Sequence, residues 1–289
     1  MKTQAFTAAA MTAFAANSLL CRLALGEGLI DAASFASVRV ISGALLLVAL
    51  ALPSWRRVGR PAVDPLAVFS LFAYLALFAF AYLTLSAGTG ALLLFGAVQM
   101  TMFARALHSG ERFWAVGWIG LALAIAGLVY LVAPGVTSPD PLGASLLAGA
   151  GIAWGLYSVR GRGAGNPLGS TANNFLFSIP LCLAVSLVYL GQWHVTATGV
   201  LWAVLSGAVA SGIGYVIWYA ALKGLNAASA ATVQLSVPVI AALGGVALLG
   251  EPLTLRMVLS GTAVLGGIAL VLLQNQRQGK RVKAILDRD

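Results

Sequence analysis

The sequence predicts an all-α integral membrane protein with ten transmembrane helices, arranged as two inverted five-helix repeats with both termini in the cytoplasm. Three observations lead to this fold class. The chain has 289 residues, of which 60% are hydrophobic and only 9% are charged, and this composition leaves too little polar surface to cover a soluble core. Apolar stretches long enough to cross a bilayer recur between short polar segments. The second half of the chain also resembles the first.

Ten apolar stretches supply the expected helices in order. A helix needs roughly 20 apolar residues to cross a hydrocarbon layer of about 30 Å. The stretches lie at 4–24, 34–52, 65–85, 89–107, 113–132, 142–160, 170–190, 198–222, 226–248 and 254–274. We expect the first stretch to be a retained helix and not a cleaved signal peptide, because nine further spans follow it.

The polar segments between these stretches divide the chain into parts. Residues 133–141 are rich in Pro, Gly, Ser and Asp, which favour turns. We therefore expect a first five-helix repeat over residues 1–133, a linker over 134–141, a second five-helix repeat over 142–274 and a cytoplasmic tail over 275–289.

Two offsets align the halves. An offset of 140 residues places Gly110-Glu111 on Gly250-Glu251, and an offset of 138 residues places Arg22 on Arg160. Each half holds an odd number of predicted spans, so the second half must start on the opposite face of the membrane. The repeat is therefore inverted, which is the plan of alternating-access transporters that bind a substrate between their halves.

The Lys and Arg residues set the expected orientation. Fourteen of the seventeen fall in segments on the same side as the N-terminus, and cytoplasmic segments are the ones that carry such an excess. The other three are Arg22 and Arg256 in outer segments and Arg39 inside the second span. This bias also accounts for the net charge of +9, and since the chain has no motif for reading bases, we expect no binding to nucleic acid.

The residues and spacings resemble those of a known group of transporters. Beside the ten spans, the second span has an Arg near its start (Ser37-Val38-Arg39), and a Gly-Glu pair opens the last helix of each half (Gly110-Glu111 and Gly250-Glu251). The sixth span contains Trp154-Gly155-Leu156-Tyr157, and the ninth contains Ser236-Val237-Pro238-Val239. In these features the chain is similar to the drug/metabolite transporter superfamily with its EamA-like ten-helix exporters. Within that superfamily it most resembles the aromatic amino acid exporters of the bacterial inner membrane.

The resemblance implies export of small metabolites from a cavity between helices 1 to 4 and 6 to 9, with helices 5 and 10 at the periphery. The sequence departs from a symmetric pattern at one position. Pro238 in the ninth span corresponds to Val98 in the fourth, so a symmetric pair of broken helices is not expected.

Charged side chains in the spans are few. All eight acidic residues, as well as His108 and His194, fall in loops or near predicted helix ends, so no titratable group is expected at the bilayer centre. Arg39 is the one charge inside a span. We assign it a structural role, by snorkelling or by hydrogen bonding to helix-end carbonyls, while a role in substrate binding stays open. We expect Glu111 and Glu251 to be structural caps at the first turns of the fifth and tenth helices.

Aromatic residues mark the candidate substrate site. Tyr74, Phe78 and Tyr82 share one face of the third helix, since they are spaced i, i+4, i+8. The eighth span carries Tyr215, Trp218 and Tyr219, of which Trp218 corresponds to Phe78, and the sixth carries Trp154 and Tyr157. Phe78 and Trp218 lie deep in their spans, while we place Tyr82 and Tyr219 toward the inner end. We predict that Phe78 and Trp218 face each other across the substrate path, with core packing as the alternative reading of these rings.

Three amides in the spans complete the candidate site. Asn17, Gln99 and Gln234 must find hydrogen-bond partners in the membrane, either on another helix or on a ligand in a wet cavity. We add Pro238 to the site, because a proline frees a backbone carbonyl that can accept a hydrogen bond from an ammonium group.

These residues predict an inner-membrane exporter of amino acids, aromatic and other neutral ones, that works by alternating access. The alternative is efflux of drugs or organic cations, which aromatic rings can hold by cation–π contacts. We expect no enzyme activity, since the chain has no phosphate-binding, zinc-protease or acyl-transfer constellation. We also expect no catalytic residue, no cofactor and no metal, with Cys21 and Cys182 as isolated packed thiols. The expected partners are a small-molecule substrate and the lipid bilayer, and the chain itself is expected to be a monomer or a weak homo-oligomer.

Overall fold

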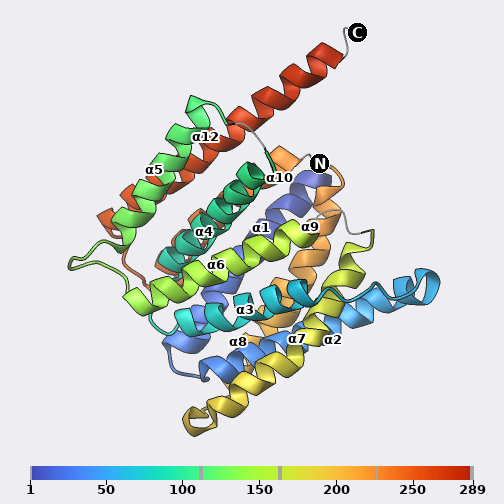
Figure 1. The fold of residues 1–289 in the computed structure, drawn as a ribbon. Helices are drawn as coiled ribbons and strands as arrows, with labels where there is room; N and C mark the ends of the chain where they lie inside the picture. Colours follow the sequence, from blue (N-terminus) through green and yellow to red (C-terminus); the bar gives the residue numbers. More distant parts are fainter. Residues whose placement is uncertain (1, 111–112, 162–164, 226, 287–289) are drawn as a thin grey trace.

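The protein is a bundle of long apolar helices that lie roughly along one direction (Figure 1). The computed structural model describes residues 2–110, 113–161, 165–225 and 227–286. The first half of the chain supplies α1 (Lys2–Gly26), α2 (Ala32–Val58), α3 (Pro65–Ala81), α4 (Ala87–His108) and α5 (Ala115–Val132). The second half begins with α6 (Pro141–Gly161) and α7 (Pro167–Val188), followed by a short 3₁₀ turn, η1 (Leu190–Gln192).

Two spans of the second half are interrupted. The eighth consists of α8 (Ala197–Val204), the π-helical segment η2 (Leu205–Ile213) and α9 (Gly214–Leu222). The ninth consists of α10 (Ala227–Gln234) and α11 (Ser236–Leu249), and α12 (Leu255–Leu286) ends the bundle. Pro238 explains the second interruption, because a proline lacks the N–H that would bond the carbonyl four residues earlier. In the first half α4 is continuous through Val98, so the expected asymmetry is confirmed.

The helices confirm an integral, multi-pass membrane protein. Within the described residues, nine helical stretches have the length and hydropathy needed to cross a bilayer. The tenth, α3, has 17 residues and is apolar but shorter than the predicted span 65–85. It ends early because residues 82–85 form a turn, after which Ser86 caps α4 by accepting a hydrogen bond from the Thr89 N–H.

The helix contacts follow the repeat: when each span is replaced by its counterpart in the other half, the same pairs of helices are in contact. Helix α2 packs on α7, α4 on α11 and α5 on α12, while the contact of α3 with α6 has its counterpart in the contact of α1 with α8, η2 and α9. The repeat-equivalent residues Gly110 and Gly250 both have a positive φ at the end of a helix, at 84° and 64°. This pattern favours the predicted pair of inverted repeats, whose boundaries at 134–141 stay a prediction.

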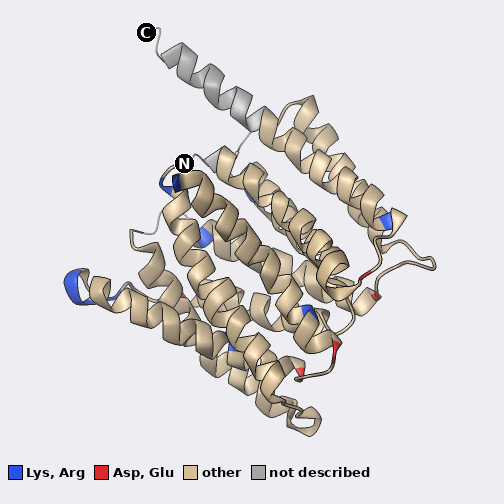
Figure 2. Cartoon of the chain, turned by 180° about the vertical axis from the view of Figure 1, so that it is seen from behind, with Lys and Arg blue, Asp and Glu red and all other residues tan. Residues whose placement is uncertain are grey.

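The bundle has two chemically different ends. Helix α1 begins and α12 ends at the same end, called here the inner end, and the acidic segments visible in Figure 2 lie at the opposite, outer end. The outer loops contain Glu27, Asp31, Asp140 and Glu251. A cytoplasmic inner end is the orientation that the basic residues predict. The sequence-based placement of Tyr82 was wrong, because α3 runs from the inner to the outer end and Tyr82 follows its last residue.

Helices α5 and α12 approach so closely that their backbones touch. A Cβ on Gly267 would overlap the Gly120 carbonyl oxygen and lie 2.7 Å from the Ala124 nitrogen, whereas a Cβ on the neighbouring Gly266 would meet nothing within 4 Å. Small residues of this kind allow membrane helices to pack by backbone contact.

Gly267→Ala should therefore lower the midpoint of thermal unfolding of the protein in detergent, because overpacking costs about 1–3 kcal/mol. The matched control is Gly266→Ala, for which the midpoint should stay unchanged or rise slightly, since Ala is the better helix former by up to about 1 kcal/mol. Equal effects of the two substitutions would contradict the close contact.

Candidate functional site

A cavity of about 460 Å³ lies between the two halves. Residues of α1, α3, α4, α6, α7, α9 and α10 line it, and none of the lining residues that the structure describes comes from α5 or α12, which agrees with the peripheral place expected for those helices. The lining is made of aromatic rings, aliphatic side chains, amides and hydroxyls, and among the residues that the structure describes no acidic, basic or histidine side chain lines it.

Most of the predicted site residues line this cavity. They come from six spans: Asn17, Tyr74, Phe78, Gln99, Trp154, Tyr157, Tyr215, Trp218, Tyr219 and Gln234. Tyr82 and Pro238 do not line it. Tyr82 is fully buried beyond the outer end of the cavity, and Pro238 is buried within α11, next to the helix break that follows the cavity residue Gln234. Phe78 and Trp218 both line the cavity, and that they face each other across the substrate path stays a prediction. Their ring contacts are with other residues, Phe78 with Tyr74 and Tyr82 and Trp218 with Phe14.

Trp154 connects the aromatic rings of the cavity. Its ring stacks on that of Tyr215, with centroids 5.6 Å apart and an interplanar angle of 16°. It also contacts Tyr74 at 4.8 Å and Tyr157 at 5.3 Å. Phe14 of α1, which the sequence reading missed, contacts Tyr215 at 5.8 Å. Rings from both halves thus enclose the middle of the cavity.

A polar network lies at the outer end of the cavity. The Asn17 amide lines the cavity, donates to the Ser211 hydroxyl at 3.2 Å and accepts a hydrogen bond from the Ser206 hydroxyl. Both serines belong to η2. In this π-helical segment Gly207 lies against α2, where a Cβ would overlap the Arg39 carbonyl oxygen. The irregular turn therefore brings two hydroxyls to the cavity-lining Asn17 amide, in line with the frequent occurrence of π turns at functional sites.

Arg39 belongs to this network. Its Nη2 donates to the Tyr74 hydroxyl at 3.0 Å and to the Ser211 hydroxyl at 3.5 Å, and its guanidinium carbon lies 4.8 Å from the Phe78 ring centroid. The residue is 0% exposed, so the expectation that it snorkels to the surface is wrong. The side chain points into the bundle because the two aromatic rings and the hydroxyls give it contacts there.

A second polar cluster lies at the inner end of the cavity. The Tyr219 and Thr171 hydroxyls are 2.6 Å apart, and the Tyr157 hydroxyl is 3.4 Å from both the Thr171 hydroxyl and the Asn174 amide nitrogen. The sequence reading missed Thr171 and Asn174 of α7. A signal was present, since Ser170, Thr171, Asn174 and Ser178 are spaced i, i+1, i+4, i+8 and form a polar stripe on one face of an apolar helix.

The amides of Gln99 and Gln234 line the cavity and have no hydrogen-bond partner among the described residues. A membrane amide needs a partner, and in a cavity that partner is water or a ligand. These two amides are therefore free to bind a substrate.

The cavity opens toward the inner end. Its lining includes residues at the inner ends of four helices: Gly161 of α6, Pro167 of α7, Leu222 of α9 and Ala230 of α10. Beside this opening the Arg160 Nε donates to an Asp64 carboxylate oxygen at 2.7 Å and joins α6 to the start of α3. That hydrogen bond lowers the pKa of the Asp64 carboxyl below its usual value, so the ion pair persists at neutral pH.

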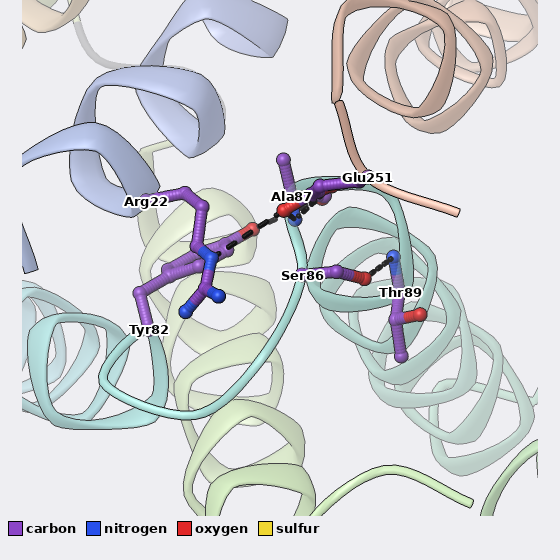
Figure 3. Close-up of polar contacts among 6 residues, drawn as sticks. All are labelled: Arg22, Tyr82, Ser86, Ala87, Thr89 and Glu251. Carbon is purple, nitrogen blue, oxygen red and sulfur yellow. Dashed lines mark hydrogen bonds and ion pairs between the residues drawn. The ribbon is translucent and has the colours of Figure 1, made fainter. Parts of the chain in front are cut away.

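The outer end is closed by a cluster that we call the outer seal, consisting of Arg22, Tyr82, Ser86, Ala87 and Glu251 (Figure 3). Both carboxylate oxygens of Glu251 accept a hydrogen bond from the Ala87 N–H at 2.9 Å, and one of them lies 3.4 Å from the Arg22 Nε. The Tyr82 hydroxyl donates to the Ala87 carbonyl at 3.4 Å. The seal joins α1 and the start of α4 to the loop between α11 and α12.

The prediction that Glu251 caps its own helix was wrong. Its carboxylate lies at the first turn of α4, while Thr254 caps α12 by accepting a hydrogen bond from the Met257 N–H at 3.2 Å. The physical reason for the prediction still holds, because the unpaired N–H groups at a helix start stabilise a carboxylate. The helix that Glu251 stabilises is α4, which is distant in sequence. Glu111 lies outside the described residues.

Removing the Glu251 carboxylate should loosen the outer end. Fully buried Cys21 lies on α1 next to Arg22 and can report on this. In a Cys182→Ala background, Glu251→Ala should raise the rate at which Cys21 reacts with an impermeant maleimide in intact cells. A carboxylate at a helix start contributes about 0.3–2 kcal/mol, which allows an increase of up to about tenfold or somewhat more.

The matched control is Glu27→Ala, which removes an exposed acidic side chain from the same end and should leave the rate unchanged. If Cys21 stays equally protected in both variants, Glu251 does not hold the outer end closed.

Comparison with known proteins gives a consistent set of similarities. The sequence pattern of the EamA-like transporter family matches residues 141–273. The chain is 50% identical to an uncharacterised protein of Pseudomonas aeruginosa, with 94% of each chain covered. It is 32% identical to the threonine/homoserine exporter RhtA of Salmonella typhimurium, over 82% of this chain and 80% of the exporter, and 31% identical to that of Escherichia coli K12, over 78% and 77%.

A solved crystal structure shares the fold. It superposes with a TM-score of 0.65 over 93% of this chain and 97% of the other, at 19% sequence identity. This similarity extends along nearly the whole of both chains.

Proposed function

This chain belongs to the EamA-like transporter family of the drug/metabolite transporter superfamily, and on that premise we propose that it exports neutral amino acids, aromatic ones among them, across the bacterial inner membrane by alternating access. Membership of a family of transporters favours this interpretation over an enzyme. The single observation that carries the proposal is the cavity between the halves, lined by rings and amides.

The chemistry of the cavity suits an amino acid with an uncharged side chain. Its volume of about 460 Å³ is typical of small-molecule sites, which span about 300–1,000 Å³. Phe14, Phe78 and Trp218 can cover an apolar side chain, whose full burial contributes about 1.5–3 kcal/mol. The free amides of Gln99 and Gln234 can bind the polar end of the molecule.

The relatives support amino acids as the substrate class. The two exporters from Salmonella typhimurium and Escherichia coli are named for threonine and homoserine, whereas the rings of this cavity favour larger side chains. A substrate panel should therefore contain both kinds. Organic cations are the weaker candidate, since the described lining residues include no acidic side chain and a buried arginine lies behind the cavity wall.

The geometry supports an inward-open state of an alternating-access cycle. The cavity is open at the inner end and closed at the outer end by the outer seal. Export then requires the seal to open and the inner opening to close. The interrupted eighth and ninth spans lie on the cavity, where irregular helices allow local rearrangement.

Purified protein in liposomes should show saturable counterflow of phenylalanine or threonine, which a passive pore cannot produce. Trp218→Ala should weaken the apparent affinity for phenylalanine by roughly tenfold or more and affect threonine less, because the lost contact is with the apolar side chain. The control is Trp118→Ala, since Trp118 is 50% exposed on α5, away from the cavity.

If Trp218→Ala lowers the apparent affinity for both amino acids equally and also lowers the yield of folded protein, Trp218 is a packing residue. Counterflow of a cationic dye without any amino acid would contradict the proposed substrate class.

Transport should not depend strictly on a proton gradient. Within the described part of the chain the cavity lining contains no Asp, Glu or His, and His108 and His194 lie at helix ends or in a loop. We expect downhill uptake of an amino acid into liposomes to continue after the proton gradient is collapsed with an uncoupler, as long as a substrate gradient remains. Uptake that stops under these conditions, and that one carboxylate or histidine substitution abolishes, would contradict this expectation.

A further inference from the structure

We propose that the outer end of the cavity is a carboxylate subsite, in which Arg39 acts through the Tyr74 hydroxyl to select substrates that carry a carboxylate. This inference rests on the proposed function and narrows it. Amino acids would be held by their carboxylate at the outer end, and the corresponding amides and amines would be poor substrates.

The first argument is an uncompensated charge. Arg39 is 0% exposed inside a membrane-spanning helix, where a buried cation is costly unless it is paired. Its partners are the Tyr74 and Ser211 hydroxyls and the faces of two aromatic rings, all of them neutral. The Nε and Nη1 groups have no hydrogen-bond partner, and the ion pairs of the described residues do not include Arg39. Among the described residues the charge of Arg39 is therefore balanced by no anionic side chain.

The second argument is a path from this charge to the cavity. The Tyr74 hydroxyl accepts a hydrogen bond from Arg39, so its own proton is free to be donated, and Tyr74 lines the cavity. Asn17 also lines the cavity, and its amide nitrogen uses one of its two protons on Ser211. The outer end thus presents an O–H and an N–H donor with a cation directly behind them. Hydrogen bonds of this charge-assisted kind are stronger than those between neutral groups.

The third argument concerns the size of the anion. Two donors and one positive charge fit the two oxygens of a carboxylate, while phosphate would require more donors and more charge. The rings of Phe78 and Trp154 lie next to Tyr74, at 5.3 and 4.8 Å between centroids, where the apolar part of the same molecule would follow. The free amides of Gln99 and Gln234 remain for the amino group.

The test compares pairs of molecules that differ only at this group. One pair is phenylalanine and phenylalanine amide, measured as competitors of counterflow in liposomes. The other is 3-phenylpropionate and 3-phenylpropanamide, whose binding to the purified protein is measured as a change in its tryptophan fluorescence, to which the cavity residues Trp154 and Trp218 contribute. We expect the wild-type protein to prefer the acid of each pair by at least about tenfold.

Three variants then test whether Arg39 and Tyr74 cause the preference for the acid over the amide. Arg39→Gln and Tyr74→Phe should reduce the ratio of acid to amide affinity toward one, while Arg39→Lys, which keeps the charge, should retain part of it. Arg256→Gln is the control, because Arg256 bonds backbone carbonyls outside the cavity and the ratio should not change. If Arg39→Gln does not fold, Arg39→Lys and Tyr74→Phe still decide the question.

The outcomes separate this inference from the proposed function. The carboxylate subsite would be overturned if amino acids showed counterflow but the protein did not prefer the acid over the amide. It would also be overturned if the variants lost affinity for the acid and the amide equally. Either result would leave the exporter proposal intact. A preference for phenylpropionate that depends on Arg39, in a protein that moves no amino acid, would support the subsite and contradict the exporter proposal.

Discussion

The structure depends on one constraint, namely that hydrocarbon offers no hydrogen-bond partner to a polar group. Polar side chains in the spans therefore bond the backbone of their own helix, as Thr101 and Ser158 do, or turn toward another helix or the cavity. Asn17 uses the serines of η2, and Thr171 uses two tyrosines. The same constraint that stabilises the bundle thus collects the polar groups around one cavity and gives that cavity its chemistry.

Local features of the sequence predicted the spans and much of the cavity wall. Helix periodicity placed Tyr74 and Phe78 on one face, and the rarity of amides in spans identified Asn17, Gln99 and Gln234 as exceptional. Those signals reside in neighbouring residues, so they can be read without knowing which helices touch. The polar stripe of α7 was equally readable but was overlooked, because its hydroxyls are less exceptional in a membrane helix than an isolated glutamine.

The features that the sequence did not reveal depend on contacts between distant segments. Glu251 was recognised as a carboxylate at a helix start, but the helix is α4, whose N-terminus is 164 residues away. The burial of Arg39 depends on the rings of α3 and on a π-helical turn in η2, which leaves no local signature beyond small residues. Tyr82 shares the periodicity of the cavity rings, yet the early end of α3 places it in the outer seal.

The outer seal also makes loop length part of the closing mechanism. Gly250, with a φ of 64°, ends α11 in a left-handed turn, and the next residue is the glutamate that reaches α4. A single added residue there would carry the carboxylate away from Ala87. The other outer segment near this helix pair, residues 133–140, has no such requirement at its middle, where Val136 is fully exposed. The linker between the two halves can therefore accept added residues, while the loop between α11 and α12 must keep its length for Glu251 to reach α4.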